Sequence, residues 1–157
     1  MYMQRVGKHG LSINIPIQFF HVDMDNIFVY GMLLFEDEEP AHGIETKRYL
    51  KSVRPAWVEG NLYVVEGFPF LVLGGENRVK GKILEFNEIG YILDKYDVIE
   101  GANQPNPFFE RVIVKAHLED DTTDKAYCYV GGKSLRECFA KEKYLIESGD
   151  WLDASPD

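Results

Sequence analysis

The longest nearly unbroken apolar run in the chain spans residues 26–35 and has Gly31 in its middle. The four positions before the glycine are all apolar, which is typical of a central strand buried on both faces. A glycine inside a strand marks a bend, a bulge or a close approach to the backbone. We therefore predict a strand that ends at Tyr30 and turns at Gly31, so that the amides of Met32 and Leu33 face a cavity. Free N–H groups of this kind suit a carboxylate or an oxyanion, and a barrel corner without a ligand is an equally good interpretation of this stretch alone.

The rest of the chain carries several further strand patterns. Strands are predicted at residues 56–65, 67–73, 78–86, 108–117 and 125–130, with a Gly-Gly-Glu-Asn turn at 74–77. Glycines recur within the predicted strands, at Gly31, Gly60 and Gly81. Because strands that bend at several points curve the sheet as a whole, these glycines favour a strongly curved sheet or a small barrel.

One helix is well defined by apolar residues at helical spacing, and it runs from Glu88 to about Ile99. Asn87 is a suitable N-cap residue, and Gly101 is suited to end the helix. Shorter helices are predicted at residues 43–52 and 134–141.

Two acidic residues lie at the end of this helix. Asp97 and Glu100 follow Leu93 by four and seven positions, so both are expected on its inward face. Acidic groups in the last turn oppose the helix dipole by roughly 0.3–1 kcal/mol each, and burial beside a second carboxylate raises a pKa towards neutrality, as a general base requires. The alternative is that both are surface residues that pair with Lys95 or Arg111.

Length and charge limit the remaining possibilities. A chain of 157 residues, 45% of them hydrophobic, is most simply one folded domain. We expect residues 1–23 to be an N-terminal extension, in which residues 11–15 alternate and add an edge strand, and residues 24–157 to be the compact domain. The net charge of -9 argues against binding to nucleic acid or to an anionic membrane, because both need clustered Lys and Arg.

Neither the cysteines nor the histidines form a recognisable site. Cys128 and Cys138 have no metal-ligand spacing and make no disulfide framework, and Cys128 is expected to be a buried thiol. The four histidines are scattered, so no metal site is expected. No apolar segment approaches the roughly 20 residues that span a bilayer, and the first residues lack the cleavage site of a signal peptide. These observations predict a reduced, cytoplasmic protein.

The loop Tyr30-Gly31-Met32-Leu33 resembles the tyrosine-glycine-small residue-leucine loop that opens the γ-glutamylcyclotransferase-like (AIG2-like) proteins. The resemblance continues in order through short motifs at residues 60–63, 67–69, 79–81, 93–94, 109–112, 126–129 and 148–151. It covers about residues 27–151, and it rests on the number and order of the motifs, since each one is short.

This resemblance implies an α+β fold, a small closed or nearly closed mixed β-barrel flanked by short helices. It also implies a reaction in which the α-amine of a γ-glutamyl compound attacks its own side-chain carbonyl and releases 5-oxoproline. A carboxylate acts as base and then as acid, and Tyr30, Gly31, Met32 and Leu33 bind the substrate. No metal or cofactor is implied, and the expected assembly is a monomer or homodimer.

Two departures from the family pattern concern the site. The family usually has a small hydroxylated residue where this chain has Met32. Its base is a glutamate shortly after a Leu-Asp pair, often followed by glycine. Aligned on Leu93-Asp94, that position is Asp97, whereas aligned on the Glu-Gly dipeptide it is Glu100. Both remain candidates for the base, since register favours the aspartate and side-chain length favours the glutamate.

The predicted function is therefore the release of 5-oxoproline from a small γ-glutamyl amine or γ-glutamyl amino acid, with Glu100 or Asp97 as general base. The alternative is a non-enzymatic module on the same scaffold, which binds a small ligand or regulates a partner. A hydrolase with a Ser or Cys nucleophile has no supporting arrangement in the sequence.

Overall fold

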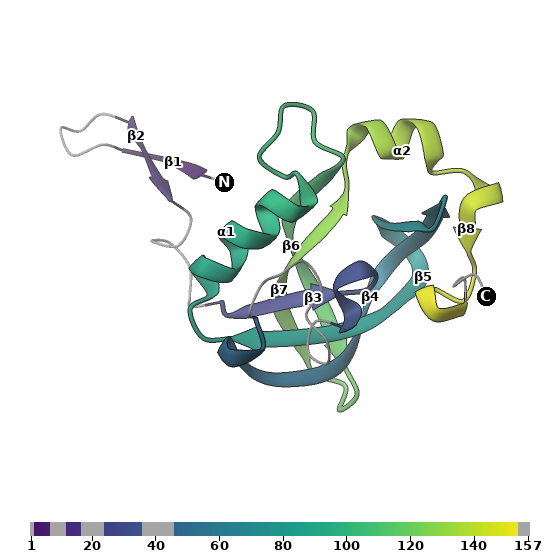
Figure 1. Ribbon diagram of the computed structural model, residues 1–157, viewed down its shortest axis with the longest axis horizontal. Coiled ribbons are helices and arrows are strands. Elements are labelled where there is room, and N and C mark those ends of the chain that lie inside the picture. The colour runs from purple at the N-terminus through teal and green to yellow at the C-terminus, as the bar shows by residue number, and fades with distance from the viewer. Residues whose placement is uncertain (1, 7–11, 17–23, 36–45, 154–157) are drawn as a thin grey trace.

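A computed structural model describes residues 2–6, 12–16, 24–35 and 46–153 of the chain (Figure 1). Its strands are β1 (Tyr2–Val6), β2 (Ser12–Pro16), β3 (Asn26–Val29), β4 (Leu50–Val65), β5 (Phe68–Phe86), β6 (Phe109–Leu118), β7 (Thr123–Gly131) and β8 (Leu145–Ile146). Its α-helices are α1 (Ile89–Glu100) and α2 (Lys133–Phe139), and short 3-10 helices lie at Met32–Phe35, Lys47–Tyr49, Glu142–Tyr144 and Trp151–Asp153.

Five of the described strands close into a barrel. They follow one another in the order β5-β3-β7-β6-β4, and β4 pairs again with β5 (Figure 1). β3 and β7 run parallel, with Ile27 opposite Tyr127, and the other pairs around the barrel are antiparallel. β8 extends the sheet beside β4. The predicted α+β fold, a small closed mixed barrel with flanking helices, is confirmed.

Apolar side chains cover both faces of β3, as the sequence predicted for a central strand. Phe28 and Tyr30 belong to the core inside the barrel, whereas Ile27 and Val29 belong to a second core between the barrel and α1. None of the four is more than 6% exposed. Because β3 lies between β5 and β7, the turn at Gly31 begins deep in the molecule.

The long strand β5 differs from the two strands predicted at residues 67–73 and 78–86. Its pairing with β4 passes from Leu73, opposite Gly60, to Arg78, opposite Glu59. The predicted turn at 74–77 is therefore an excursion within one strand, at the point where the register with β4 shifts. Further along β5, a side chain at Gly81 would collide with the carbonyl oxygen of Val29, so the glycine permits β3 and β5 to approach closely.

Two helix predictions require correction. Only the 3-10 helix Lys47–Tyr49 replaces the predicted helix at 43–52, and β4 already begins at Leu50; residues 43–45 lie outside the described residues. The N-cap of α1 is Glu88, in a left-handed conformation, rather than Asn87. The Asn87 amide instead donates to the carbonyl oxygen of Tyr49 at 2.7 Å, which prolongs the sheet by one residue. Gly101 ends the helix with φ of 69°, as predicted.

The N-terminal strands form a separate sheet. β1 and β2 pair antiparallel with each other, with Tyr2 opposite Pro16. The predicted edge strand at residues 11–15 corresponds to β2, whose partner is the preceding strand of the same hairpin and not a strand of the barrel sheet.

The C-terminal region is joined to the barrel by backbone bonds and apolar packing. The Lys80 amide donates to the carbonyl oxygen of Gly149 at 2.8 Å, and Trp151 packs against the core inside the barrel.

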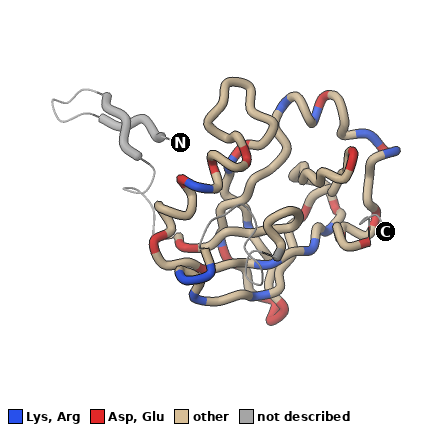
Figure 2. The backbone as a smooth tube through the Cα atoms, in the orientation of Figure 1, with Lys and Arg blue, Asp and Glu red and all other residues tan. Residues whose placement is uncertain are grey.

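No described helix has the length and apolar character to span a membrane. Basic and acidic positions are both distributed along the described backbone (Figure 2).

Candidate functional site

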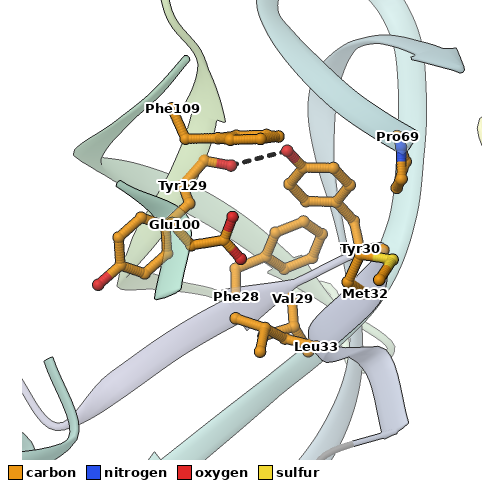
Figure 3. Close-up of a pocket in the computed structure, with 10 residues that line it drawn as sticks. Phe28, Val29, Tyr30, Met32, Leu33, Pro69, Glu100, Phe109 and Tyr129 are labelled. Carbon is orange, nitrogen blue, oxygen red and sulfur yellow. Dashed lines mark hydrogen bonds between the residues drawn. The ribbon is translucent and has the colours of Figure 1, made fainter. Parts of the chain in front are cut away.

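A pocket opens where β3 turns into the 3-10 helix Met32–Phe35, and we call it the glycine-loop pocket (Figure 3). The empty space within it, including its open mouth, is about 340 Å³. Its lining residues come from five separate segments of the chain and are Phe28, Val29, Tyr30, Gly31, Met32, Leu33, Pro69, Glu100, Phe109 and Tyr129.

Glu100 brings a carboxyl group into this apolar pocket. It is the last residue of α1, and its carboxylate points towards the space between the rings of Phe28 and Tyr30 (Figure 3). Burial raises the pKa of Glu100 from 4.5 to about 7, because the surrounding side chains hydrate the charged form poorly. The carbonyl end of the helix dipole also disfavours negative charge at this position. A carboxyl group of this kind can accept and return a proton near neutral pH.

The glycine loop forms the opposite part of the lining. A side chain at Gly31 would collide with the ring of Pro69, so the loop can pack against β5 only with glycine at this position. The Leu34 amide donates to the carbonyl oxygen of Gly31 at 2.8 Å and closes the first turn of the 3-10 helix. Within the described parts of the chain, the amides of Met32 and Leu33 have no backbone acceptor, as expected at a helix start.

The Tyr30 hydroxyl is engaged within the protein. It donates to the carbonyl oxygen of Tyr129 at 2.7 Å and accepts from the Leu71 amide at 3.1 Å, and burial raises the pKa of this phenol. The hydroxyl thus joins the end of β3 to β7 and β5. Its ring forms one wall of the pocket, and the bond to Tyr129 is drawn in Figure 3.

Asp97 has its own partners, on the outer face of the sheet. The Tyr129 hydroxyl donates to one carboxylate oxygen at 2.6 Å, and Arg111 donates to the other at 2.9 Å. Arg111 and Tyr129 stand directly opposite each other on β6 and β7, so their side chains reach α1 together. Asp97 lines a second, polar pocket with Asn103 and Arg111, and it is not among the residues of the glycine-loop pocket.

The structure thus brings together five of the six predicted site residues. Tyr30, Gly31, Met32 and Leu33 line one pocket with Glu100, whereas Asp97 lies outside it. Sequence analysis gave no site role to the remaining lining residues, which are Phe28, Val29, Pro69, Phe109 and Tyr129. The Gly-Phe-Pro sequence at 67–69 did point to Pro69, because it follows a predicted strand and is one of the short motifs that resemble the family.

The two cysteines and the possible metal ligands remain to be placed. Cys128 is buried inside the barrel, as predicted, and Cys138 is exposed. Burial raises the pKa of the Cys128 thiol, and the nearby Glu100 carboxylate adds to this effect. Among the described residues, no three His, Cys, Asp or Glu side chains gather into a possible metal site.

Fold and site together define a small mixed barrel whose first central strand turns at a glycine into a pocket with one partly buried carboxyl group. A family model described as gamma-glutamyl cyclotransferase, AIG2-like, matches residues 27–153. The chain belongs to this family. The resemblance noted in the sequence is therefore confirmed over nearly the same residues.

Solved structures show the same fold at low sequence identity. A crystal structure of a mouse AIG2-like protein is 17% identical, with a TM-score of 0.53, over 82% of this chain and 88% of that one. YkqA from Bacillus subtilis is 20% identical, with a TM-score of 0.54, over 82% of this chain and 40% of that one. A solution structure of an Arabidopsis thaliana protein is 21% identical, with a TM-score of 0.51, over 70% of each chain. No curated protein matches the chain significantly.

Proposed function

We propose that this chain is a γ-glutamylcyclotransferase that converts a small γ-glutamyl compound into 5-oxoproline and a free amine, with Glu100 as its general base. The observation that supports this most directly is the Glu100 carboxyl group, with a pKa of about 7, in an apolar pocket beside the glycine loop. Membership of the family supports the same reaction class on independent grounds.

In this proposal the glutamyl moiety binds at the Met32 and Leu33 amides, which have no backbone acceptor among the described residues. The α-carboxylate of the substrate accepts hydrogen bonds from Met32 and Leu33, in the manner of anions at helix starts. This places the adjacent α-ammonium group near Glu100, which lines the same pocket. The pocket walls then fold the substrate so that its amine lies near its own side-chain carbonyl, which makes the attack intramolecular.

The chemistry moves two protons from the attacking nitrogen to the leaving nitrogen through Glu100. Glu100, with a pKa of about 7, first takes one proton from the α-ammonium group. The free amine attacks the γ-carbonyl carbon and closes the five-membered ring. Glu100 passes its proton to the leaving nitrogen, and the bond from the carbonyl carbon to that nitrogen breaks. Glu100 then takes the second proton from the ring nitrogen, which becomes the lactam N–H, and passes it to the released amine, which departs as an ammonium ion.

Asp97 has a positioning role in this proposal. Both of its carboxylate oxygens are bound by Tyr129 and Arg111, and its site lies outside the glycine-loop pocket. It holds the side chain of Tyr129, a residue that also lines the pocket with Glu100. We further propose that the reaction needs no metal or cofactor and takes place in the cytoplasm, as composition predicted.

The test is 5-oxoproline release from a panel of γ-glutamyl amines and γ-glutamyl amino acids by the wild type, E100Q and D94N. Asp94 is an exposed carboxylate on the same helix, so D94N is the matched control. We expect E100Q to lose at least about a hundredfold in kcat, as for removal of a general base, and D94N to keep wild-type activity. A folded E100Q variant with full activity would contradict the proposal. If the wild type binds panel members but releases nothing from any of them, the non-enzymatic binding module becomes the better interpretation.

A further inference from the structure

Basic side chains gather on the outside of the barrel, where β5, β4, β6 and β7 lie side by side. Four exposed residues, which we call the basic face, are Arg78 and Lys80 on β5, Lys115 on β6 and Lys125 on β7. Each is next in sequence to a residue of the core inside the barrel, namely Val79, Val114 or Ala126. Because successive side chains of a strand point to opposite faces, the four basic side chains point outward.

The charge of the basic face is not balanced within the described part of the chain. None of its four side chains makes an ion pair with a described residue. Glu59 stands opposite Arg78 in the sheet, but its carboxylate lies 3.8 Å from the imidazole of His117. Lys115 and Lys125 stand directly opposite each other on β6 and β7, an arrangement in which like charges are destabilising. An anionic ligand would relieve this repulsion.

Trp57, on β4, orients one of the basic groups. The Arg78 guanidinium lies 4.0 Å from the centroid of the Trp57 ring. The His117 ring stacks on the same indole, with 3.9 Å between centroids and 8° between planes. Because β5 and β6 flank β4 on opposite sides, the two groups cover opposite faces of the indole. A stacked guanidinium keeps its in-plane N–H donors available to a carboxylate, so Arg78 is oriented before a ligand binds.

We propose that the basic face docks an extended acidic segment of a partner polypeptide. Arg78 and Lys80 are two positions apart on one strand, roughly 7 Å, and side chains on one face of an extended peptide repeat at the same interval. Carboxylates at alternate positions of such a segment therefore meet both cations. This docking site lies on the outside of the barrel and does not depend on the function proposed for the glycine-loop pocket.

Two features favour a polypeptide over a nucleic acid or an anionic membrane. Single-stranded nucleic acid binds largely by stacking its bases on exposed aromatic rings, and both faces of the Trp57 ring are already covered. The chain as a whole carries a net charge of -9, so a long polyanion or a charged bilayer is repelled beyond the basic face. A short acidic segment meets the local charge alone, because salt screens charges beyond about 8 Å under physiological conditions.

Fluorescence anisotropy with the full chain tests this proposal at physiological ionic strength. The probe is a labelled ten-residue peptide in which glutamate and serine alternate, and the control peptide has glutamine in place of glutamate. We expect the wild type to bind the glutamate peptide at least about tenfold more tightly than the glutamine peptide.

Two triple variants locate the binding. The combination of K80Q, K115Q and K125Q should weaken binding of the glutamate peptide by at least about tenfold. The control combines K95Q, K133Q and K141Q, which removes the same charge from exposed positions on α1 and on or just after α2, and should stay within about twofold of the wild type. Circular dichroism establishes that both variants are folded.

A loss of affinity confined to the basic-face variant supports the proposal. Equal affinity of the wild type for the two peptides, or an equal loss in the two triple variants, overturns it. Stronger competition by oligothymidylate or by phosphatidylserine vesicles than by unlabelled peptide also overturns it, because the face would then bind a polyanion. A wild type that is dimeric without peptide, beside a monomeric basic-face variant, overturns it in favour of a second copy of this chain; size-exclusion chromatography gives that comparison.

Discussion

Asp97 and Glu100 show how strongly the surroundings of a side chain determine its chemistry. They lie three positions apart at the end of α1, and helical spacing placed both on the inward face. The sequence could not separate them, because the partners of Asp97 come from β6 and β7, more than ten residues further along the chain. Arg111 and Tyr129 neutralise and bind Asp97, which leaves Glu100 as the acid in the apolar pocket.

The raised pKa of Glu100 predicts a stability change. Its pKa is about 7 in the folded chain and 4.5 in the reference state, so the folded state binds the proton more tightly and loses stability as the pH rises from about 4.5 to 7. E100Q removes this loss. When the pH is raised from about 4 to about 8, we expect the difference in unfolding free energy between E100Q and the wild type to shift in favour of E100Q by up to about 3 kcal/mol. Urea unfolding at both pH values measures the gain.

The control for this experiment is D94N, which should follow the wild type at both pH values because Asp94 is exposed. If E100Q and the wild type instead lose stability in parallel as the pH rises, the Glu100 carboxyl group does not carry the raised pKa.

Gly31 gives a steric prediction at the same scale. A Cβ atom here would collide with Pro69, so G31A must push the glycine loop away from β5. We expect a loss of about 1–3 kcal/mol in unfolding free energy, together with weaker substrate binding. The matched control is G90A in α1, where a Cβ atom meets nothing within 4 Å; this change should stabilise the helix by about 0.5–1 kcal/mol. Equal effects of the two substitutions on the melting temperature would refute the steric argument.

At the scale of elements, α1 is joined to the barrel through its last turn. Asp97 connects it to β7 through Tyr129 and to β6 through Arg111. The buried side chains of the same helix, Ile92, Leu93 and Tyr96, pack against the barrel. The position of Glu100 depends on this attachment, since it follows Asp97 by less than one helical turn. The helix thus places the candidate base while the sheet holds the helix.

Removing the arginine from this attachment should be costly. R111M leaves the largely buried Asp97 carboxylate without its cation, and we expect a loss of about 2–4 kcal/mol in unfolding free energy. K133M removes one partner of the exposed Lys133–Glu137 pair and should change stability by less than about 0.5 kcal/mol. Chemical denaturation of both variants gives the comparison. Similar losses in the two would mean that the Asp97–Arg111 pair does not anchor the helix.

The elements show which sequence patterns were informative. The apolar run before Gly31 predicted a central strand because both of its faces are buried, and the 3.6-residue period predicted α1 to within one residue at each end. The helix at 43–52 was wrong because pairing of β4 with β5 begins at Leu50 and overrides a weak local preference. Gly74 and Gly75 correctly marked an irregularity. That the chain continues as one strand through it depends on pairing with β4, which the local sequence does not reveal.

At the scale of the whole molecule, the barrel and α1 bring five separate segments to one pocket. The glycine positions predicted a curved sheet. The closed barrel was indicated only by the order of the short motifs, which pointed to the family. The apolar walls from Pro69, Phe109 and Tyr129 were missed because each residue taken alone is an ordinary core or loop side chain. Their importance comes from their position around Glu100, which is a property of the closed barrel.

Enclosure by the barrel sets the pH dependence of activity in the proposed reaction. The base must be ionised, so kcat/KM should fall about tenfold per pH unit below about pH 7, where Glu100 becomes protonated, and level off above it. Initial rates of 5-oxoproline release from pH 5 to pH 9, on a substrate whose own pKa values are known, measure this limb. An acid limb centred near the ordinary carboxyl pKa of 4.5 would exclude Glu100 as the base.

The parallel pairing of β3 with β7 has a consequence for how the protein is made. Tyr30 and Tyr129, which join the two strands by a hydrogen bond, lie 99 positions apart, so a ribosome completes β3 long before its partner leaves the exit tunnel. During that interval one edge of an apolar strand lacks its neighbour, a state open to aggregation or to capture by a chaperone. The glycine-loop pocket, which Tyr129 helps to line, forms only when this last pairing closes. Nascent chains stalled before residue 129 should therefore be sensitive to protease at the glycine loop, and chains released after residue 153 should be protected.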